Sequence, residues 1–200
     1  MEGLGPGVVG AVAALHGPYY AANWNLGPGF EARVAIGMGQ FALRYDPASD
    51  LVLTVQDDAA IRGSLVLDLN DADSGERGSS VWKGAHLRFF VLDEHCRGTG
   101  LGRAMLERAM AHVDAHADGR CWLTTFAGLD TARRMYERHG FVCTQSETGT
   151  RWGFELTDQT FERRVASGER RVTTGDRRRP IEPLLPRQAR PRKPSVLTRP

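Results

Sequence analysis

The sequence predicts an α/β domain over residues 1–166, followed by a basic tail over residues 167–200. Several segments alternate apolar and polar residues as strands do, and others repeat apolar residues with the 3.6-residue period of a helix. The tail differs from both in charge and proline content. Because 41% of the 200 residues are hydrophobic, the chain can fill one core.

The N-terminal part is predicted to be helical. Residues 7–24 are mostly small and apolar, and Gly17 and Pro18 interrupt them, which predicts a helix, a break and a short second helix. Residues 30–45 carry an apolar stripe, so we expect an amphipathic helix that packs on a sheet. The stripe consists of Phe30, Val34, Gly37 or Met38, Phe41 and Tyr45.

Strands are predicted in the middle of the domain. Residues 51–55 and 61–69 alternate in polarity and predict two strands. Residues 70–80 are rich in Asp, Gly and Ser, which is typical of a long turn, and residues 82–92 predict a third, longer strand. A glycine-rich turn then opens a helical pattern that ends at about residue 116.

The remainder of the domain alternates between strand and helix. Residues 121–126 predict a strand, and residues 130–139 predict a helix with Asp130 as its N-cap and Gly140 after its end. Three shorter segments close the domain: strands at residues 141–144 and 150–156, and a turn or helix at residues 159–165.

The glycine-rich turn has the features of a pyrophosphate site. Its sequence is Arg97-Gly98-Thr99-Gly100-Leu101-Gly102, and it connects an apolar strand to a helix. Alternate glycines let a backbone approach an anion closely, and the first amides of a helix supply unsatisfied donors at the positive end of its dipole. The sequence therefore predicts a phosphorylated cofactor.

Two common phosphate-binding motifs do not match. A P-loop needs a lysine followed by Ser or Thr, and the only lysines, Lys83 and Lys193, are not placed for that role, which argues against ATP. A dinucleotide fingerprint needs its third glycine where Arg103 stands. The phosphate-binding pattern that remains is an Arg-x-x-Gly-x-Gly turn that follows a strand.

This turn and a second motif resemble the GNAT superfamily of N-acetyltransferases. The second motif is Ala132-x-x-x-Tyr136-Glu137-x-x-Gly140-Phe141, which follows the strand at residues 122–126. The order of elements agrees with that family over roughly residues 7–166. Four segments further resemble the acetyltransferase half of bacterial proteins that fuse a MarR-type regulator to a GNAT domain; they start at His16, Phe30, Leu87 and Leu129.

The resemblance implies a mixed, mostly antiparallel sheet flanked by helices, with strands splayed at an acyl-coenzyme A (CoA) site. It implies acetyl transfer from acetyl-CoA, as co-substrate, to a primary amine, by direct attack in a ternary complex and without a metal. The pantetheine would lie along the strand end, and an amide near Val91 would polarise the thioester. The implied cofactor-binding residues are Phe90, Val91, Leu92, Arg97, Gly98, Thr99, Gly100, Leu101, Gly102 and Arg103.

The chain departs from the family pattern at two places. Only six residues precede Gly7, so the strand that usually comes before the first helix is expected to be short or missing. Leu129 stands where the family often has an asparagine, which would remove one side-chain contact to the cofactor.

Two residues are candidates for the catalytic proton transfers. Tyr136 matches the family position of the donor that protonates the departing CoA thiolate. His86 lies eleven residues before Arg97, where some relatives carry a glutamate, and a histidine can accept a proton near neutral pH. An alkylammonium with a pKa near 10.4 must lose a proton before it attacks, so His86 is a candidate base or water-orienting group. Both side chains could instead serve only in packing.

Further residues are candidates for binding the acceptor. His16, Tyr19 and Tyr20 lie in the segment that usually forms the acceptor wall, although core packing would explain them equally well. Arg88 alternates with Phe89 on the long strand and either faces the acceptor or pairs with a carboxylate. Small amines, antibiotics, amino acids and protein lysines all remain open, because the motifs serve the donor.

Composition bears on location and on partners. The three cysteines, Cys96, Cys121 and Cys143, have no metal-like spacing, which is typical of reduced thiols in a cytoplasm, and no apolar run is long enough for a bilayer. Residues 167–200 contain ten basic residues, three acidic residues and six prolines, so the tail is predicted to be disordered. It is either a solvated extension or a segment that holds nucleic acid or an acidic partner.

Two other functions stay open. The chain could be a non-catalytic acyl-CoA sensor, or a nucleic-acid-associated protein that acts through its basic tail. Homodimers are common in the GNAT superfamily, but no segment of the sequence predicts an interface.

Overall fold

The computed structural model describes residues 1–58, 60–70, 84–150 and 155–164, and confirms the predicted α/β class. Its elements are α1 (Val8–Trp24), α2 (Pro28–Arg44), β1 (Leu51–Gln56), β2 (Ile61–Asp68), β3 (Ala85–Leu92), the 3-10 turn η2 (Glu94–Cys96), α3 (Leu101–His116), β4 (Cys121–Phe126), α4 (Asp130–Arg138), β5 (Phe141–Gly149) and β6 (Leu156–Arg163).

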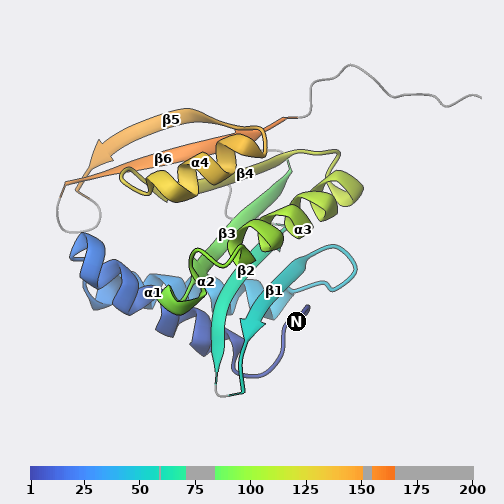
Figure 1. The fold of residues 1–200 in the computed structure, drawn as a ribbon, viewed down its shortest axis with the longest axis horizontal. Coiled ribbons are helices and arrows are strands. Elements are labelled where there is room, and N and C mark those ends of the chain that lie inside the picture. The colour runs from blue at the N-terminus through green and yellow to red at the C-terminus, as the bar shows by residue number, and fades with distance from the viewer. Residues whose placement is uncertain (59, 71–83, 151–154, 165–200) are drawn as a thin grey trace, which may run out of the picture. The chain divides into compact units, whose positions relative to one another are not determined.

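The strands form one sheet in the order β1-β2-β3-β4-β6-β5 (Figure 1). All neighbouring strands run antiparallel except β3 and β4, which are parallel. The segment before α1 adds a single antiparallel bridge between Glu2 and Leu53, and the Gly3 amide donates to the Val52 carbonyl at 2.9 Å. The expected first strand is therefore reduced to this bridge along the edge of β1.

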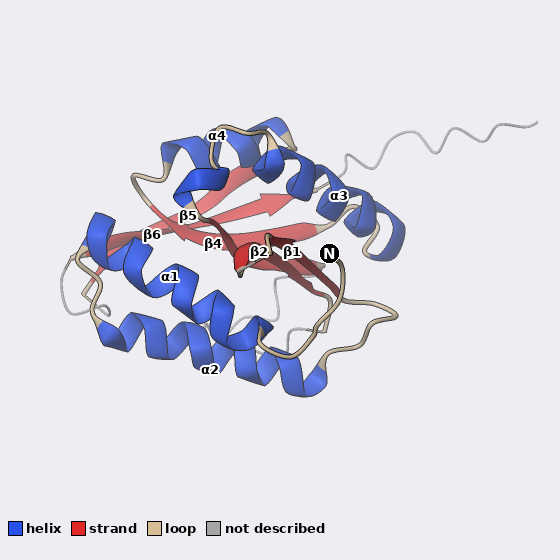
Figure 2. Ribbon diagram, turned by 60° about the horizontal axis from the view of Figure 1, so that its bottom comes forward, coloured by secondary structure: helices blue, strands red, loops and turns tan. Residues whose placement is uncertain are grey.

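Helices cover both faces of the sheet (Figure 2): α1 and α2 lie on one face, and α3 and α4 on the other. Alternating strand residues divide between two cores because successive side chains point to opposite faces. Leu65 and Leu67 pack with Leu106 of α3, whereas Val52 and Val66 pack with the helices of the opposite face. As expected from its apolar stripe, α2 packs on the sheet.

The two parallel strands separate soon after they begin. β3 pairs with β4 only at Ala85 and His86, opposite Cys121 and Trp122. β3 also carries an extra residue opposite β2, where Phe89 has a positive φ of 50° and its carbonyl accepts a 2.7 Å hydrogen bond from the Ser64 hydroxyl. A bulge bends its strand. The end of β3 is thus turned away from β4, which opens the middle of the sheet.

The predicted break in the first helix is wrong. α1 continues through Pro18 to Trp24, although proline removes one helical hydrogen bond at a cost of about 3 kcal/mol. Packing offsets this cost, because Val8, Val12 and His16 are buried on the same helix. Gly17 marks a close approach instead of a break: an added Cβ would lie 2.4 Å from the Glu31 carboxylate of α2.

Two C-terminal predictions also need correction. Residues 159–165 were expected to form a turn or helix, but residues up to Arg163 belong to strand β6, which pairs with both β4 and β5. Leu129, not Asp130, occupies the N-cap of α4. Gly140 ends that helix with a φ of +84°, as expected of a left-handed cap.

Some predictions lie outside the described residues. These are the tail at residues 167–200, nearly all of the turn at residues 70–80, the first residues of the strand at 82–92 and most of the strand at 150–156. Among the described helices, none is long and apolar enough to cross a bilayer. The described parts of the chain also hold no group of three metal-ligating side chains.

Candidate active site

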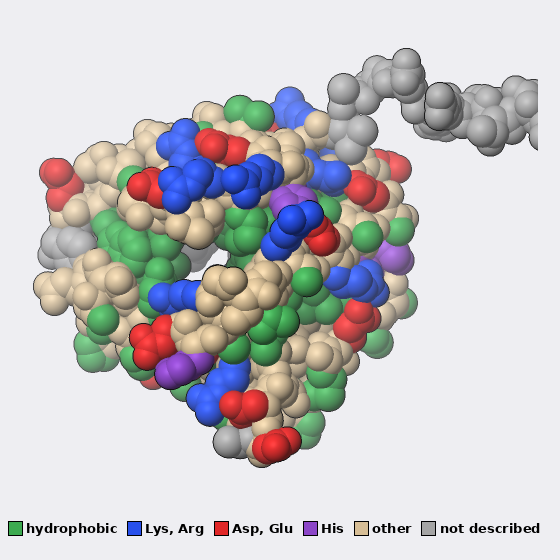
Figure 3. Space-filling model, in the orientation of Figure 1, with side chains coloured by type: hydrophobic (Ala, Val, Ile, Leu, Met, Phe, Trp, Pro, Cys, Tyr) green, Lys and Arg blue, Asp and Glu red, His purple; other side chains and the backbone are tan. Residues whose placement is uncertain are grey.

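A large cavity opens where β3 and β4 separate. It has a volume of about 830 Å³ and lies among the end of β3, the glycine turn, α4 and the C-terminal turn of α1. Figure 3 shows a hollow in this face of the molecule, with apolar side chains in its wall and basic side chains at its rim. Eight of the ten predicted cofactor-binding residues line this cavity: Phe90, Val91, Leu92, Arg97, Gly98, Gly100, Gly102 and Arg103.

The glycine turn presents a backbone cradle to this cavity. Gly98 and Gly100 have φ angles of +74° and +88°, which favour glycine, and open space lies where their Cβ atoms would be. α3 starts with neither a side-chain cap nor an acidic residue in its first turn. Its first amides and the positive end of its dipole therefore suit an anion supplied by a ligand, and the residues present fit a pyrophosphate.

Arg97 connects the glycine turn to the end of β3 and to α1. Its guanidinium donates to the Leu92 carbonyl through Nε at 3.2 Å and Nη2 at 3.0 Å, and it lies 4.4 Å from the centre of the Tyr19 ring. The Thr99 hydroxyl donates to the Cys96 carbonyl at 2.7 Å, and the Thr99 and Leu101 side chains do not line the cavity. Tyr19 lies on this side of the sheet opening and not in the predicted acceptor wall.

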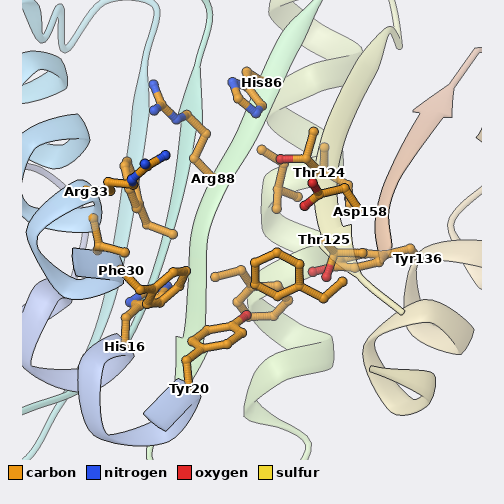
Figure 4. A pocket seen from close by; sticks show the side chains of 16 residues that line it. His16, Tyr20, Phe30, Arg33, His86, Arg88, Thr124, Thr125, Tyr136 and Asp158 are labelled. Atoms are coloured by element: carbon orange, nitrogen blue, oxygen red, sulfur yellow. The ribbon is translucent and has the colours of Figure 1, made fainter. Parts of the chain in front are cut away.

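A second, smaller cavity lies beyond the first. Its volume is about 250 Å³, and its walls come from α1, α2, β3, β4 and β6 (Figure 4). Three predicted acceptor residues, His16, Tyr20 and Arg88, line it together with the candidate base His86.

Four residues line both cavities: Tyr20, Phe90, Thr125 and Tyr136. The two spaces therefore meet at these side chains, which we call the junction. Tyr136 is buried there against Phe90, Phe141 and Phe161. Burial raises the pKa of the Tyr136 phenol well above its ordinary value, so this group stays protonated at physiological pH. A buried neutral phenol can donate a hydrogen bond to an atom that gains negative charge.

Two cavities that meet at a buried proton donor suit a group transfer between two substrates, and comparison with known proteins decides the family. The model of the acetyltransferase (GNAT) family matches residues 11–141. The chain belongs to the GNAT acetyltransferase family. As the family uses acetyl-CoA, the larger cavity with its glycine cradle is the candidate donor cleft of this GNAT domain.

Relatives of this GNAT protein include a probable spermine N(1)-acetyltransferase of Bacillus subtilis subsp. natto, which is 33% identical over 70 residues. That match covers 34% of the chain and only 43% of the relative. The fold is similar to a ribosomal-protein-alanine N-acetyltransferase from Brucella melitensis (TM-score 0.60, 13% identity, 82% of this chain and 99% of the other). It is also similar to a putative acetyltransferase from Salmonella typhimurium solved with its cofactor acetyl-CoA (TM-score 0.51, 14% identity, 68% and 75%).

The candidate base His86 of the GNAT domain lies away from the junction. Its ring stacks on Trp122 with 3.5 Å between the ring centres, where β3 and β4 are still paired. His86 lies four residues before Phe90 on β3, with the bulge at Phe89 between them. Figure 4 likewise shows His86 and Tyr136 well apart in the cavity. His86 thus lines the smaller cavity but not the donor cleft.

His16 lies closer to the junction. Its ring stacks on Tyr20 at 6.0 Å and meets the edge of Phe89 at 6.3 Å. Nδ1 lies 2.8 Å from the Val12 carbonyl, so the proton belongs on Nδ1 and Nε2 carries the lone pair. Burial lowers the pKa of His16 from 6.5 to about 4, and its ring is neutral at pH 7.

Other lining residues went unnamed in the sequence analysis: Arg33, Thr124, Thr125 and Asp158 in the smaller cavity, and Arg134 in the donor cleft. Arg134 belongs to the matched segment that starts at Leu129, which is a usable signal, whereas Arg33 occupies an unmatched position of the segment that starts at Phe30. Asp158 had none, because it lies between the strand expected at residues 150–156 and the turn or helix expected at residues 159–165.

Buried neutral His16 predicts a loss of stability in acid. Its folded pKa of about 4 lies below the unfolded 6.5, so the unfolded state binds more protons between these values. This contribution is present above pH 6.5 and is lost as the pH falls toward 4. We expect the free energy of unfolding to drop between pH 7 and pH 4.5 by about 2 kcal/mol less in His16→Gln than in the parent protein. Urea titrations at both pH values measure this, with His95→Gln, at an exposed histidine, as control.

Proposed function

We propose that the chain transfers an acetyl group from acetyl-CoA to a primary amine by direct attack in a ternary complex. The observation that carries this proposal is the junction: a donor cleft and a smaller cavity share Tyr20, Phe90, Thr125 and Tyr136. A thioester held in the cleft and an amine held in the cavity would meet there without an intermediate carrier.

The donor side would work through backbone groups. The amides at the start of α3 would hold the pyrophosphate, and bound acetyl-CoA would supply the reactive thioester at the junction. The Asp93 amide donates to the Arg62 carbonyl of β2, so by alternation Val91 also faces β2. The amides of Phe90 and Leu92 would then face the cleft. We therefore favour these two over Val91 as the groups that polarise the thioester carbonyl.

Proton movement would involve Tyr136 and a histidine. The Tyr136 hydroxyl would donate to the sulfur as the carbon–sulfur bond breaks. His86 would accept the amine proton through water, and His16, with its Nε2 lone pair nearer the junction, is the second candidate. If His86→Ala keeps the parent's turnover and pH–rate profile and His16→Gln does not, the base is His16.

Direct attack is favoured by the positions of the cysteines. None of the three lines the junction. Cys96 borders the donor cleft at the glycine turn, and the buried Cys121 has its pKa raised to about 12, mainly by burial, so it carries almost no thiolate. An acyl-enzyme would need a nucleophile at the junction.

A screen of thioester consumption tests this function. The protein is incubated with acetyl-CoA and a panel of amines that includes amino acids, amino-acid amides, polyamines, aminoglycosides and lysine peptides, and free CoA is measured by chromatography. We expect amine-dependent release of CoA and an acetylated amine of matching mass. Acetyl-CoA binding without turnover on the panel would favour a sensor instead.

Two finer predictions need separate tests. Binding to nucleic acid that falls steeply with salt and disappears on deletion of residues 167–200 would show a role for the tail. The alternative of a non-catalytic acyl-CoA sensor would gain support if acyl-CoA bound tightly but no amine were acetylated.

A further inference from the structure

We propose that the acceptor is a small amino acid, that is, an amine that carries a carboxylate a few bonds away, and not a polyamine. This inference rests on the proposed function and names the substrate class of the same site. It comes from the charges that α2, β3 and β6 bring to the smaller cavity.

Arg88 places one positive charge in the cavity wall. Its guanidinium lies 4.9 Å from the centre of the Phe89 ring, and Nη2 is within reach of Gly37 of α2, where an added Cβ would lie 3.2 Å away. The absent side chain at Gly37 thus makes room for this guanidinium. Arg88 and the junction residue Phe90 both line the smaller cavity, so one small molecule can contact both.

The buried carboxylate near Arg88 is shared with a second arginine, Arg44. Asp68 is fully buried and is held by both terminal nitrogens of Arg44, whereas Arg88 adds one longer contact of 3.4 Å through Nη1. The three side chains together carry two positive charges and one negative charge.

Arg33 adds a second arginine to the same wall. It lies four residues before Gly37, so the two positions are neighbours on one face of α2. Figure 4 shows the Arg33 and Arg88 side chains on the same side of the cavity. Two guanidiniums that converge on one small space suit a carboxylate, which accepts several charge-assisted hydrogen bonds.

The opposite wall suits an amine. Asp158 is 8% exposed and lines the cavity from β6, and Thr124 lies beside it (Figure 4). The charged lining residues that the structure describes are thus two arginines facing one aspartate. An amino acid would match this arrangement, with its carboxylate toward the arginines and its amine between Asp158 and the junction. A polyamine would place further cations beside Arg33 and Arg88.

The size of the cavity supports a small acceptor. Its volume of about 250 Å³ is below the roughly 300–1,000 Å³ that is typical of drug-sized ligands. Phe30, Phe126 and Tyr20 pack together at its edge, with ring centres 4.6–6.2 Å apart, and give it an apolar side. This side would contact the side chain of an apolar amino acid.

Matched acceptors test the charge requirement. Each amino acid of a panel is compared with its amide, which keeps the amine and side chain but lacks the carboxylate, and with spermidine and spermine. We expect kcat/KM for the best amino acid to exceed that of its amide by about 10- to 100-fold, as for a charged hydrogen bond. An amide or polyamine that equals or exceeds the amino acids would overturn the inference and leave the proposed acetyl transfer intact.

Substitutions of the two arginines test which side chains recognise the carboxylate of the acceptor. Arg33→Gln and Arg88→Gln should each lower kcat/KM for the amino acid about tenfold or more, and change that of the amide by no more than about twofold. Arg138→Gln, on the exposed end of α4, is the matched control and should change neither. If Arg88→Gln unfolds because it contacts Asp68, Arg33→Gln decides alone, since it leaves the Arg44–Asp68 pair in place. Equal losses for acid and amide would contradict the assignment.

A binding measurement separates the two proposals. If no amine is acetylated although acetyl-CoA binds, the proposed function fails. The thermal shift produced by each amino acid in the presence of CoA is then compared with that of its amide. A shift with the acid alone, weakened in Arg33→Gln, would retain the inference, and equal or absent shifts would refute it.

Discussion

Replacing Tyr136 with phenylalanine is expected to lower kcat by about 100-fold or more, with little change in KM for acetyl-CoA. The exchange removes one hydroxyl from the junction and keeps the ring, which packs among Phe90, Phe141 and Phe161. The loss should therefore fall on the step in which the thiolate leaves. Steady-state kinetics with the best acceptor measure it.

Controls separate this role from packing. Tyr45 lies at the end of α2 and packs against Phe41 with tilted rings, outside both cavities, so Tyr45→Phe should keep full turnover. Because the pKa of Tyr136 is raised, the parent enzyme should show no loss of kcat from its ionisation up to about pH 10. Full turnover of Tyr136→Phe at the pH optimum would exclude the proposed donor.

Replacing Gly84 with alanine is expected to destabilise the fold by about 2–5 kcal/mol. Gly84 has a φ of +127°, a region that side chains rarely adopt, and an added Cβ would lie 2.5 Å from the Arg120 carbonyl oxygen. The backbone has little freedom to relax, because the adjacent Ala85 amide donates to that same oxygen at 3.0 Å. The substitution lies next to Ala85, where β3 and β4 begin to pair.

Thermal unfolding measures this effect. A loss of this size in a chain of 200 residues corresponds to a fall in Tm of roughly 5–15 °C. Gly10→Ala in α1 is the matched control: nothing lies within 4 Å of the added Cβ, so this helical exchange should be neutral or stabilising by up to about 1 kcal/mol. An unchanged Tm for Gly84→Ala would refute the strained conformation.

Helices and strands were predicted correctly where the residues of one segment alone determine its structure. The strand at residues 121–126 follows directly from periodicity, and the helix expected from Arg103 onward begins two residues earlier, at Leu101, after the glycine turn. Pro18 misled because its local penalty is outweighed by contacts with α2 and the sheet, which a local pattern does not contain. Residues 159–163 misled for a similar reason, since β6 lies between two partner strands.

The sequence by itself determined the glycine turn of the candidate donor cleft, because this turn, the strand before it and the helix after it are contiguous, and their geometry follows from glycine conformations and helix amides. Only the tertiary structure decided the smaller cavity, the candidate acceptor site. Arg33, Arg88 and Asp158 come from three separate elements, and they converge because the strand order places β6 beside β4 and the bulge at Phe89 turns β3 away. Contacts between distant segments depend on packing, which no single stretch of sequence encodes.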